Sequence, residues 1–304
     1  MTQTGLPQFD GLPISVVERE TGIPKDLLRM WERRYGFPEP ARDAQGDRVY
    51  PREQVDKLRA VRRLMDQGFR PGKIIHLSAE ELSRLFEARR PREAAPAVCA
   101  RLESLLKGQE GHAIRDELQC QLHSQGLRSF VCDFLPPANQ LVGELWARGQ
   151  IEIHEEHLYT EQVTRILRET LAVLTIPQGH PKVMLTTCAG EQHVLGLLMA
   201  EALFRLSACE VLAFGADLPL TDIAQAAHKH REDVLALSFS QAYDGAPPDT
   251  LTALRRLLPP QVELWVGGAG VQGMRPSPAG HWQILRNLHD IEPLLQDWRQ
   301  RHLD

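Results

Sequence analysis

A glutamate, a histidine and a glycine stand at fixed spacing in the last third of the chain, as Glu191, His193 and Gly196. They follow an apolar run at residues 183–185 that predicts a strand. A histidine just past the carboxyl end of a parallel strand lies where open α/β sheets bind ligands. Its imidazole can ligate a metal while the Glu191 carboxylate orients the other ring nitrogen, and Gly196 lets a bulky group approach the backbone. On spacing alone, a capping or merely polar histidine is the commoner interpretation.

Basic residues near the start of the chain have a second chemical use. Lys25, Arg29 and Arg33 recur every four residues, so they share one face of a helix expected over residues 25–35. A short amphipathic helix at residues 14–20 and a turn containing Gly and Pro precede it. In a helix-turn-helix motif the second helix enters the major groove, where Arg bonds guanine edges or phosphates. The spacing fits a solvated basic helix equally well.

The charge of the chain is unevenly distributed. Its 304 residues carry 35 Lys and Arg against 40 Asp and Glu, a formal charge of −5, which taken whole argues against a nucleic-acid partner. Residues 1–76, however, hold 14 basic and 11 acidic residues, a charge of +3, and the remaining 228 residues carry −8. A basic head on an acidic body is typical of a protein in which one module meets phosphate.

The hydrophobic pattern divides the chain into three expected domains. Residues 1–76 alternate short helices with a Gly- and Pro-rich insert, and residues 77–176 show apolar repeats at i, i+3 and i+4 that predict a four-helix bundle. Residues 180–304 change period, after a linker at 176–181. The expected strands there are 183–185, 211–214, 234–238 and 262–266, separated by expected helices 193–206, 220–230 and 249–258. This alternation predicts a parallel sheet with helices on both faces, so the expected fold class is multidomain, α and α/β.

Composition also excludes several classes of protein. No apolar run is long enough to span a membrane, and no secretory signal is visible, so we expect a cytoplasmic protein without a membrane partner. The five cysteines are scattered, which disfavours a disulfide scaffold or a zinc ribbon. The glycine fingerprint of nicotinamide cofactors is absent after the first strand.

The head resembles a known family of DNA-binding proteins. The strings LRMWERRYG at residues 28–36 and GDRVY at residues 46–50 resemble the signature of MerR-family transcription regulators, over residues 12–76. The resemblance implies a winged helix-turn-helix that binds double-stranded promoter DNA as a dimer. The DNA-binding residues expected from spacing and resemblance are Lys25, Arg29, Arg33, Arg34 and Tyr35 on the recognition helix and Arg42, Arg48 and Tyr50 on the wing. Asp47 departs from the small polar residue or His that members often carry, and an acid there weakens phosphate contact.

The tail resembles a second family. Glu191-x-His193-x-x-Gly196 resembles the DxHxxG motif of cobalamin-binding domains, with Glu in place of Asp, and the resemblance covers residues 181–304. It implies a Rossmann-like (flavodoxin-like) parallel-sheet domain in which His193 ligates the cobalt. The cofactor-binding residues expected in this domain are Glu191, His193, Gly196, Ser238, Ser240, Gly267 and Gly268, the last four around the displaced dimethylbenzimidazole tail.

The helical middle carries a third motif. Trp146, followed after nine residues by Glu156 and His157, resembles the helical cap of light-sensing cobalamin regulators of the CarH/LitR type. The resemblance implies that Trp146 covers the upper face of adenosylcobalamin or methylcobalamin, with Glu156 and His157 beside the upper ligand. Ala147 stands where such sensors can carry a His that captures cobalt after photolysis, which leaves light as the stimulus open. His154 and His157 have a metal-ligand spacing, but the acids between them favour a solvated face.

Together these motifs favour a DNA-binding transcriptional regulator and not an enzyme. We expect a repressor and photoreceptor candidate, a homo-oligomer (dimer or tetramer), whose oligomeric state or DNA affinity depends on bound cobalamin. One alternative is a cobalamin-carrier subunit of a mutase or methyltransferase, which leaves the DNA-reading head unexplained. Another is a MerR-type regulator whose tail binds haem or serves only to oligomerise.

Overall fold

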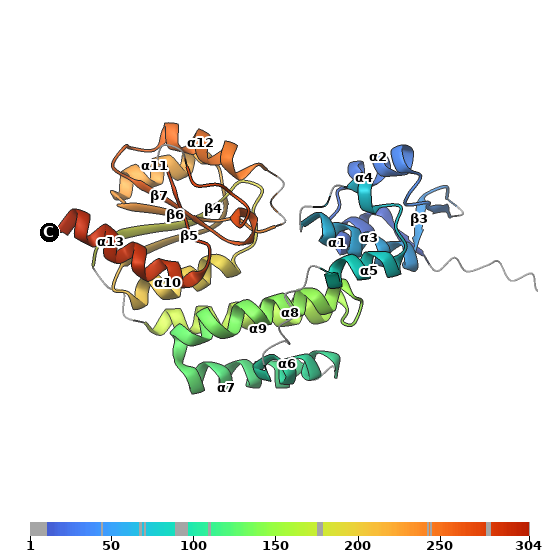
Figure 1. Cartoon of the computed structure of the whole chain (residues 1–304), viewed down its shortest axis with the longest axis horizontal. Helices are drawn as coiled ribbons and strands as arrows, with labels where there is room; N and C mark the ends of the chain where they lie inside the picture. The colour runs from blue at the N-terminus through green and yellow to red at the C-terminus, as the bar shows by residue number, and fades with distance from the viewer. Residues whose placement is uncertain are drawn as a thin grey trace, which may run out of the picture. The chain divides into compact units, whose positions relative to one another are not determined.

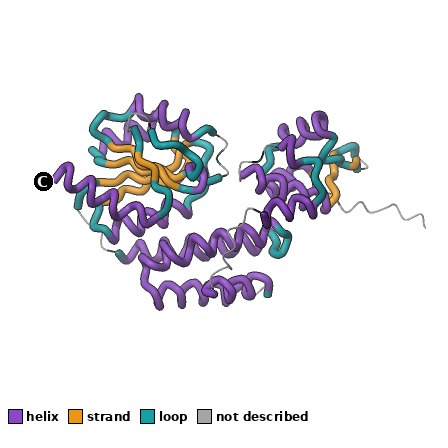
Figure 2. Tube along the Cα trace, in the orientation of Figure 1, coloured by secondary structure: helices purple, strands orange, loops and turns teal. Residues whose placement is uncertain are grey.

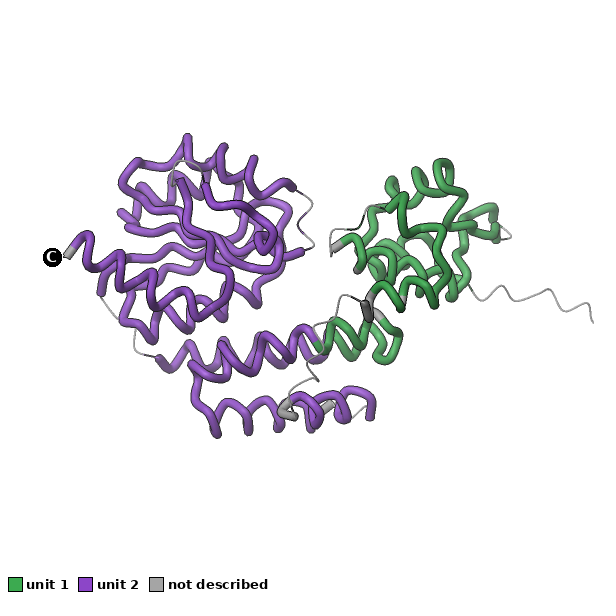
Figure 3. Tube along the Cα trace, viewed as in Figure 1, with its two compact units in different colours: residues 1–97, 141–156 green, residues 98–140, 157–304 purple. Residues whose placement is uncertain are grey.

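The computed structural model describes a chain of two compact units. The described residues are 11–43, 45–66, 69, 71–88, 97–108, 111–174, 179–241, 243, 245–277 and 281–303. The first unit combines residues 1–97 with 141–156, and the second combines 98–140 with 157–304 (Figure 3). The linker expected at 176–181 lies partly outside the described residues, since 175–178 are not among them.

The first unit contains the winged helix-turn-helix. Helices α1 (Ile14–Thr21) and α2 (Lys25–Tyr35) each end at a glycine in the left-handed region, Gly22 with φ 65° and Gly36 with φ 68°, a conformation that stops a helix at little cost. The elements that complete this unit are strands β1 (Gly11–Pro13), β2 (Ala41–Arg42) and β3 (Arg48–Pro51) and helices α3 (Arg52–Asp66), α4 (Pro71–Ile74) and α5 (Ala79–Ala88). The strands form an antiparallel sheet in the order β1-β3-β2, so the predicted wing is confirmed (Figure 1).

A single core fixes the direction in which α2 presents its polar face. Val17 of α1, Leu28 and Trp31 of α2 and Leu58 of α3 are all buried in one cluster. The apolar residues of α2 recur at helical spacing, so the opposite face carries the arginines.

The middle of the chain is helical, as expected. It comprises α6 (Ala97–Lys107), α7 (Gly111–Ser129), the π-helix η1 (Phe130–Phe134), α8 (Leu135–Ala147) and α9 (Ile153–Val173) (Figure 2). Gly126, with φ 77° and ψ 163°, interrupts α7, which the apolar pattern did not predict. Among the described residues, no helix combines the length and the apolar character needed to cross a bilayer.

The second unit holds a five-stranded parallel sheet in the order β5-β4-β6-β7-β8. Its strands are β4 (Lys182–Cys188), β5 (Glu210–Leu218), β6 (Val234–Ser238), β7 (Glu263–Gly267) and β8 (Gln283–Ile284). Helices α11 (Leu220–His230) and α12 (Pro247–Leu257) cover one face of the sheet, and α10 (Leu195–Leu206) and α13 (Ile291–Leu303) the other (Figure 1). Two short 3-10 helices, η2 (Ala269–Val271) and η3 (Leu288–Asp290), complete it.

This strand order confirms the flavodoxin-like, Rossmann-type fold and locates its binding edge. The chain leaves β4 for β5 on one side and later returns to β6 on the other side of β4. The carboxyl ends of β4 and β6 therefore flank the topological switch point, where open α/β sheets bind ligands. Most expected boundaries differ from the observed ones by a few residues, and one difference bears on the site. α10 begins at Leu195, two residues later than expected, which leaves His193 in the loop after β4.

Candidate cofactor and nucleic-acid sites

A buried carboxylate orients the exposed histidine at the switch point. Glu191 is 1% exposed, and its Oε1 lies 2.6 Å from Nδ1 of His193, whose side chain is 63% exposed. The same oxygen accepts a hydrogen bond from the His193 backbone N–H at 3.0 Å. Two bonds from one carboxylate oxygen to the backbone and the ring hold the imidazole at a set angle to the loop. The hydrogen bond predicted between these two residues is present.

The neighbouring strand supplies the rest of the carboxylate's partners. The backbone N–H of Ser240, just after β6, donates to Glu191 Oε2 at 2.7 Å, and the Ser240 hydroxyl lies 3.0 Å from His193 Nδ1. Burial opposes ionisation of Glu191, but the hydrogen bonds from His193 and Ser240 outweigh it and lower the pKa of Glu191 to about 2. The carboxylate is therefore ionised at neutral pH and accepts the Nδ1 proton.

This arrangement selects one tautomer of the imidazole. With Nδ1 protonated toward Glu191, the ring lone pair is on Nε2, the atom that a metal would bind. A ligating histidine whose second nitrogen donates to a carboxylate is the usual form of a protein metal ligand. Glu191 and Ser240 are 49 residues apart in the sequence, which gives no sign of their hydrogen bond. They meet because β4 and β6 are adjacent strands of the sheet.

The small residues of the site allow three loops to pack closely. A Cβ on Gly196 would lie 2.6 Å from the Ser238 hydroxyl, so in this structure Ser238 occupies the space that Gly196 leaves. Gly268 has a φ of 97°, and a Cβ at this position would clash with the Phe239 carbonyl oxygen. Gly267 and Ser238 are register partners of β7 and β6. The predicted residues Gly196, Ser238, Gly267 and Gly268 thus lie along the carboxyl edge of one sheet.

Two residues absent from the predicted site complete its rim. Thr187 donates to the Glu191 carbonyl and accepts from the Asp217 backbone N–H at 2.8 Å. Asp217, itself left-handed with φ 66°, accepts from the Gly190 N–H at 2.8 Å. These bonds fasten the loop after β4 to the end of β5. The only sequence signal for them is their position at strand ends.

The predicted basic residues of the recognition helix differ in how far their charge is already paired within the chain. Arg29, Arg33 and Arg34 are exposed on α2, and Arg34 stacks over the Tyr35 ring at 5.3 Å. Lys25 pairs with Glu18 at 3.0 Å and Arg29 with Asp26 at 3.2 Å, so part of their charge is already compensated.

On the wing, the exposed Arg42 donates to the Gly46 carbonyl at 2.6 Å, while Tyr50 is wholly buried. The Tyr50 hydroxyl donates to Glu32 at 2.6 Å, and Arg48 pairs with the same carboxylate at 3.0 Å. Burial and the nearby carboxylate raise the pKa of Tyr50. Tyr50 therefore has no surface to offer DNA, and its phenol positions Glu32 and Arg48 between recognition helix and wing. That corrects its expected role in direct contact.

The three predicted cap residues lie around the end of α8 and the start of α9. Trp146 is half-buried, and its indole nitrogen is buried without a hydrogen-bond partner among the described residues. Glu156 is half-buried and His157 exposed. Within the described residues no cluster of three His, Cys, Asp or Glu side chains could hold a metal ion.

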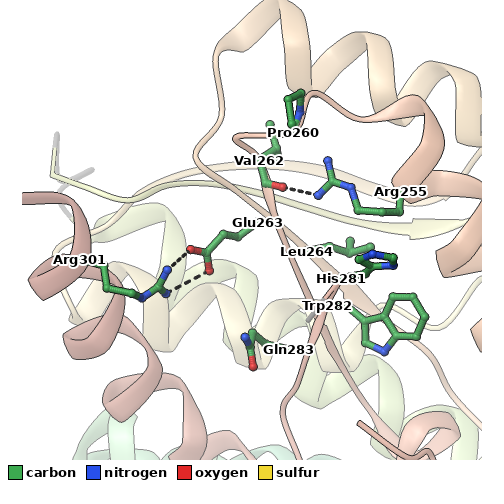
Figure 4. A pocket seen from close by; sticks show the side chains of 9 residues that line it. All are labelled: Arg255, Pro260, Val262, Glu263, Leu264, His281, Trp282, Gln283 and Arg301. Carbon is green, nitrogen blue, oxygen red and sulfur yellow. Dashed lines mark hydrogen bonds and ion pairs between the residues drawn. The ribbon is translucent and has the colours of Figure 1, made fainter. Parts of the chain in front are cut away.

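A separate hollow opens at the opposite edge of the sheet. It measures about 370 Å³ and is lined at the amino ends of β7 and β8 by Glu263, Trp282 and two arginines (Figure 4). Arg301 pairs with Glu263 at 2.7 Å, and Arg255 donates to the Val262 carbonyl at 2.6 Å. Both arginines are therefore bonded to the chain itself: Arg301 to a carboxylate and Arg255 to backbone carbonyls.

Comparison with known proteins identifies the family of the chain and the fold of its second unit. Residues 12–81 match the model of the MerR HTH family regulatory proteins. The chain is 33% identical over 272 residues to the HTH-type transcriptional repressor CarA of Myxococcus xanthus, covering 86% of this chain and 88% of CarA. It is 29% identical over 274 residues to the HTH-type transcriptional repressor CarH of the same organism, covering 85% and 89%. The monomethylamine corrinoid protein of Methanosarcina barkeri superimposes with a TM-score of 0.54 at 15% identity, over 67% of this chain and 100% of that one.

The chain is therefore a DNA-binding transcription regulator and not an enzyme, and its second unit has the fold of a corrinoid protein. The chain belongs to the MerR-type family of HTH transcriptional repressors that includes CarA of Myxococcus xanthus.

Proposed function

We propose that the chain is a transcriptional repressor whose DNA binding depends on bound cobalamin. The observation that carries this proposal is the Glu191–His193–Ser240 arrangement at the switch point of the sheet. A buried ionised carboxylate that holds the Nδ1 proton of an exposed histidine supports a role of His193 as a metal ligand, because ligating histidines usually have such a partner and a capping histidine needs none.

The residues present fit this cofactor by the chemistry of their donors. His193 would offer Nε2 to the cobalt, and Glu191 would hold Nδ1 and keep the ring basic. Ser238, Ser240, Gly267 and Gly268 would border the path of the displaced dimethylbenzimidazole nucleotide, with glycines where the backbone must be approached closely. Gly196 would keep the start of α10 clear of Ser238.

We further propose that the upper face of the corrin is covered by Trp146, with Glu156 and His157 beside the upper ligand. Adenosylcobalamin supplies a cobalt–carbon bond that visible light breaks, and methylcobalamin supplies a smaller upper group on the same bond. An aromatic ring shields such a bond from water, and a carboxylate and an imidazole suit ribose hydroxyls. Because Ala147 supplies no imidazole, a second histidine for the cobalt would have to be His154 or His157, or the chain would sense the cofactor without light.

Regulation would follow from linkage. If one arrangement of the chains binds cobalamin more tightly, the cofactor favours that arrangement, and DNA affinity changes by the same coupling free energy. Arg29, Arg33, Arg34 and Lys25 would contact the major groove, with Arg42 and Arg48 on the flanking backbone. A dimer or tetramer would place two such heads on a pseudo-palindromic site.

Gel filtration and gel shift of the full chain test this proposal. Purified protein is incubated with adenosylcobalamin in the dark, passed over a desalting column and examined for the cobalamin spectrum, for its size and for binding to the DNA upstream of its own gene. We expect retained cobalamin in the wild type and in the control His281→Ala, and its loss in His193→Ala. The sample is then illuminated, and its size and DNA binding are compared with those of the dark sample. If neither changes, photoreception is excluded, but cobalamin-dependent regulation is not. A haem spectrum, or no retained chromophore, would overturn the cofactor assignment.

A further inference from the structure

The segment that carries Trp146 is packed with the DNA-reading head. Residues 141–156, the end of α8 and the start of α9, belong to the same compact unit as residues 1–97 (Figure 3). The residue that the proposed function assigns to the cofactor therefore contacts the part of the chain that binds DNA.

The contact itself is a cation on an aromatic ring. The Arg59 guanidinium carbon, on α3, lies 5.9 Å from the centre of the Trp146 ring. Arg59 is 2% exposed, and a desolvated guanidinium on an indole face is among the stronger cation–π contacts. Two carboxylates, Asp56 at 3.1 Å and Glu20 at 2.7 Å, compensate the buried charge, and the Trp146 ring lies beside a guanidinium whose Nε has no hydrogen-bond partner among the described residues.

Arg59 is connected to the recognition helix α2 through helix α1. Arg59 Nη2 pairs with Glu20 of α1 at 2.7 Å, and Glu20 is in turn 3.7 Å from Arg52. α1 is joined to α2 by the turn at Gly22, and the two helices share the buried core. A displacement of Trp146 would therefore change the surroundings of a buried ion pair that fixes α1 on α3.

A second contact joins the same two segments. Arg52, the first residue of α3, pairs with Glu152 at 2.8 Å, and Glu152 lies just before α9. Both side chains are about half exposed, so this pair is the weaker of the two contacts.

We propose that the Arg59–Trp146 stack, with the Arg52–Glu152 pair beside it, couples the cofactor to the DNA-reading head within a single chain. The inference rests on the proposed function, since it needs the upper face of cobalamin to bear on Trp146. Arg59 is a positioning residue: it touches neither cofactor nor DNA, and it converts a change at the indole into a change at α1. Coupling by this route acts in one protomer, independently of any change in oligomeric state.

The first arm of the test uses the full chain without cofactor. A double-mutant cycle of Arg59→Lys and Trp146→Leu is followed by urea unfolding, because Lys keeps the charge toward Glu20 and loses the planar stack. We expect the two changes to be coupled by about 2- to 30-fold in the unfolding constant, the range of a cation–π contact. Additive effects would overturn the stack and the inference with it.

The second arm measures the ratio of DNA affinities with and without adenosylcobalamin in the dark, on the duplex upstream of the chain's own gene. We expect Arg59→Lys to retain cobalamin spectroscopically but to lose most of the wild-type ratio, and the control Arg115→Lys, whose partner is Glu169 on α9, to keep it. An unchanged ratio in Arg59→Lys would overturn the inference and leave cobalamin sensing intact. If the wild type retains no cobalamin, the proposed function fails, and coupling to the cofactor fails with it.

Discussion

Replacing Glu191 with Gln tests the structural basis of the cofactor site without removing the proposed ligand. The carboxylate accepts from the backbone N–H groups of His193 and Ser240 through its two oxygens, and from the His193 ring. A Gln side chain has one acceptor oxygen and one NH₂ donor, so one N–H of the loop would face another N–H. Burial at 1% exposure leaves little room for water to relieve that clash.

The pKa of Glu191 gives the size of the effect. It falls from an ordinary 4.5 to about 2. At about 1.4 kcal/mol per pH unit, the folded state favours the charged carboxylate by about 3 kcal/mol. Because the pKa is lower in the folded state, this stability is complete above about pH 5 and is lost as the pH falls toward 2. Glu191→Gln should therefore lower the free energy of unfolding by about 1–3 kcal/mol at pH 7 and by about half as much at pH 3.

Urea unfolding at several pH values, with cobalamin titration at pH 7, measures both consequences. Loss of a group that orients a metal ligand typically weakens metal affinity about 10- to 100-fold, and we expect that loss for cobalamin. The exposed neighbour Gln192→Ala serves as the control and should match the wild type. If Glu191→Gln has the wild-type urea midpoint and cobalamin affinity at pH 7, the carboxylate does not have the role assigned to it.

Three further predictions concern other parts of the chain. Arg33→Ala should weaken DNA binding by about 1–3 kcal/mol and reduce by about one the number of counterions released on binding, as read from the salt dependence of the affinity. The exposed Arg256→Ala should do neither, and equal effects of the two changes would refute groove contact by α2. Gly268→Ala should cost about 1–3 kcal/mol in urea unfolding because its φ of 97° and the neighbouring carbonyl exclude a Cβ, so wild-type stability would contradict the loop geometry. Burial raises the pKa of Glu232 to about 7, so the contribution of this side chain to the free energy of unfolding declines as the pH rises from about 4.5 to 7. Glu232→Gln should therefore stabilise the chain by about 1–3 kcal/mol at pH 8 and little at pH 4.5. A stability difference between variant and wild type that does not change with pH would argue against a buried carboxyl.

The local patterns predicted much of the second unit. Four apolar runs correspond to β4, β5, β6 and β7. The residues of β4, β6 and β7 are mostly buried, as expected of continuously hydrophobic strands, whereas β5 lies at the sheet edge and is mostly exposed or half-buried. The fifth strand, β8, has two residues and begins with a polar Gln, so it carries no such signal. The break in α7 at Gly126 was also missed, since a glycine inside an apolar repeat is often tolerated.

The candidate site was predictable only in its local part. Glu191 and His193 are two residues apart, so their hydrogen bond follows from the loop, whereas the Ser240 partner depends on the strand order. The sequence also did not indicate which side chains are exposed. The MerR-like string GDRVY did not distinguish a Tyr50 that reaches DNA from one that is buried against Glu32. Sequence spacing likewise gave no sign that Trp146 packs on Arg59, because 87 residues separate them.

Electron paramagnetic resonance of the cob(II)alamin form tests the central claim most directly. The full chain is labelled with ¹⁵N-histidine, loaded with unlabelled cobalamin and reduced to the paramagnetic state. If His193 is the lower ligand, the superhyperfine splitting changes from the triplet of ¹⁴N to the doublet of ¹⁵N, and His193→Ala abolishes the doublet. A triplet that persists in the labelled wild type would show that dimethylbenzimidazole stays on the cobalt, and would contradict the role assigned to His193.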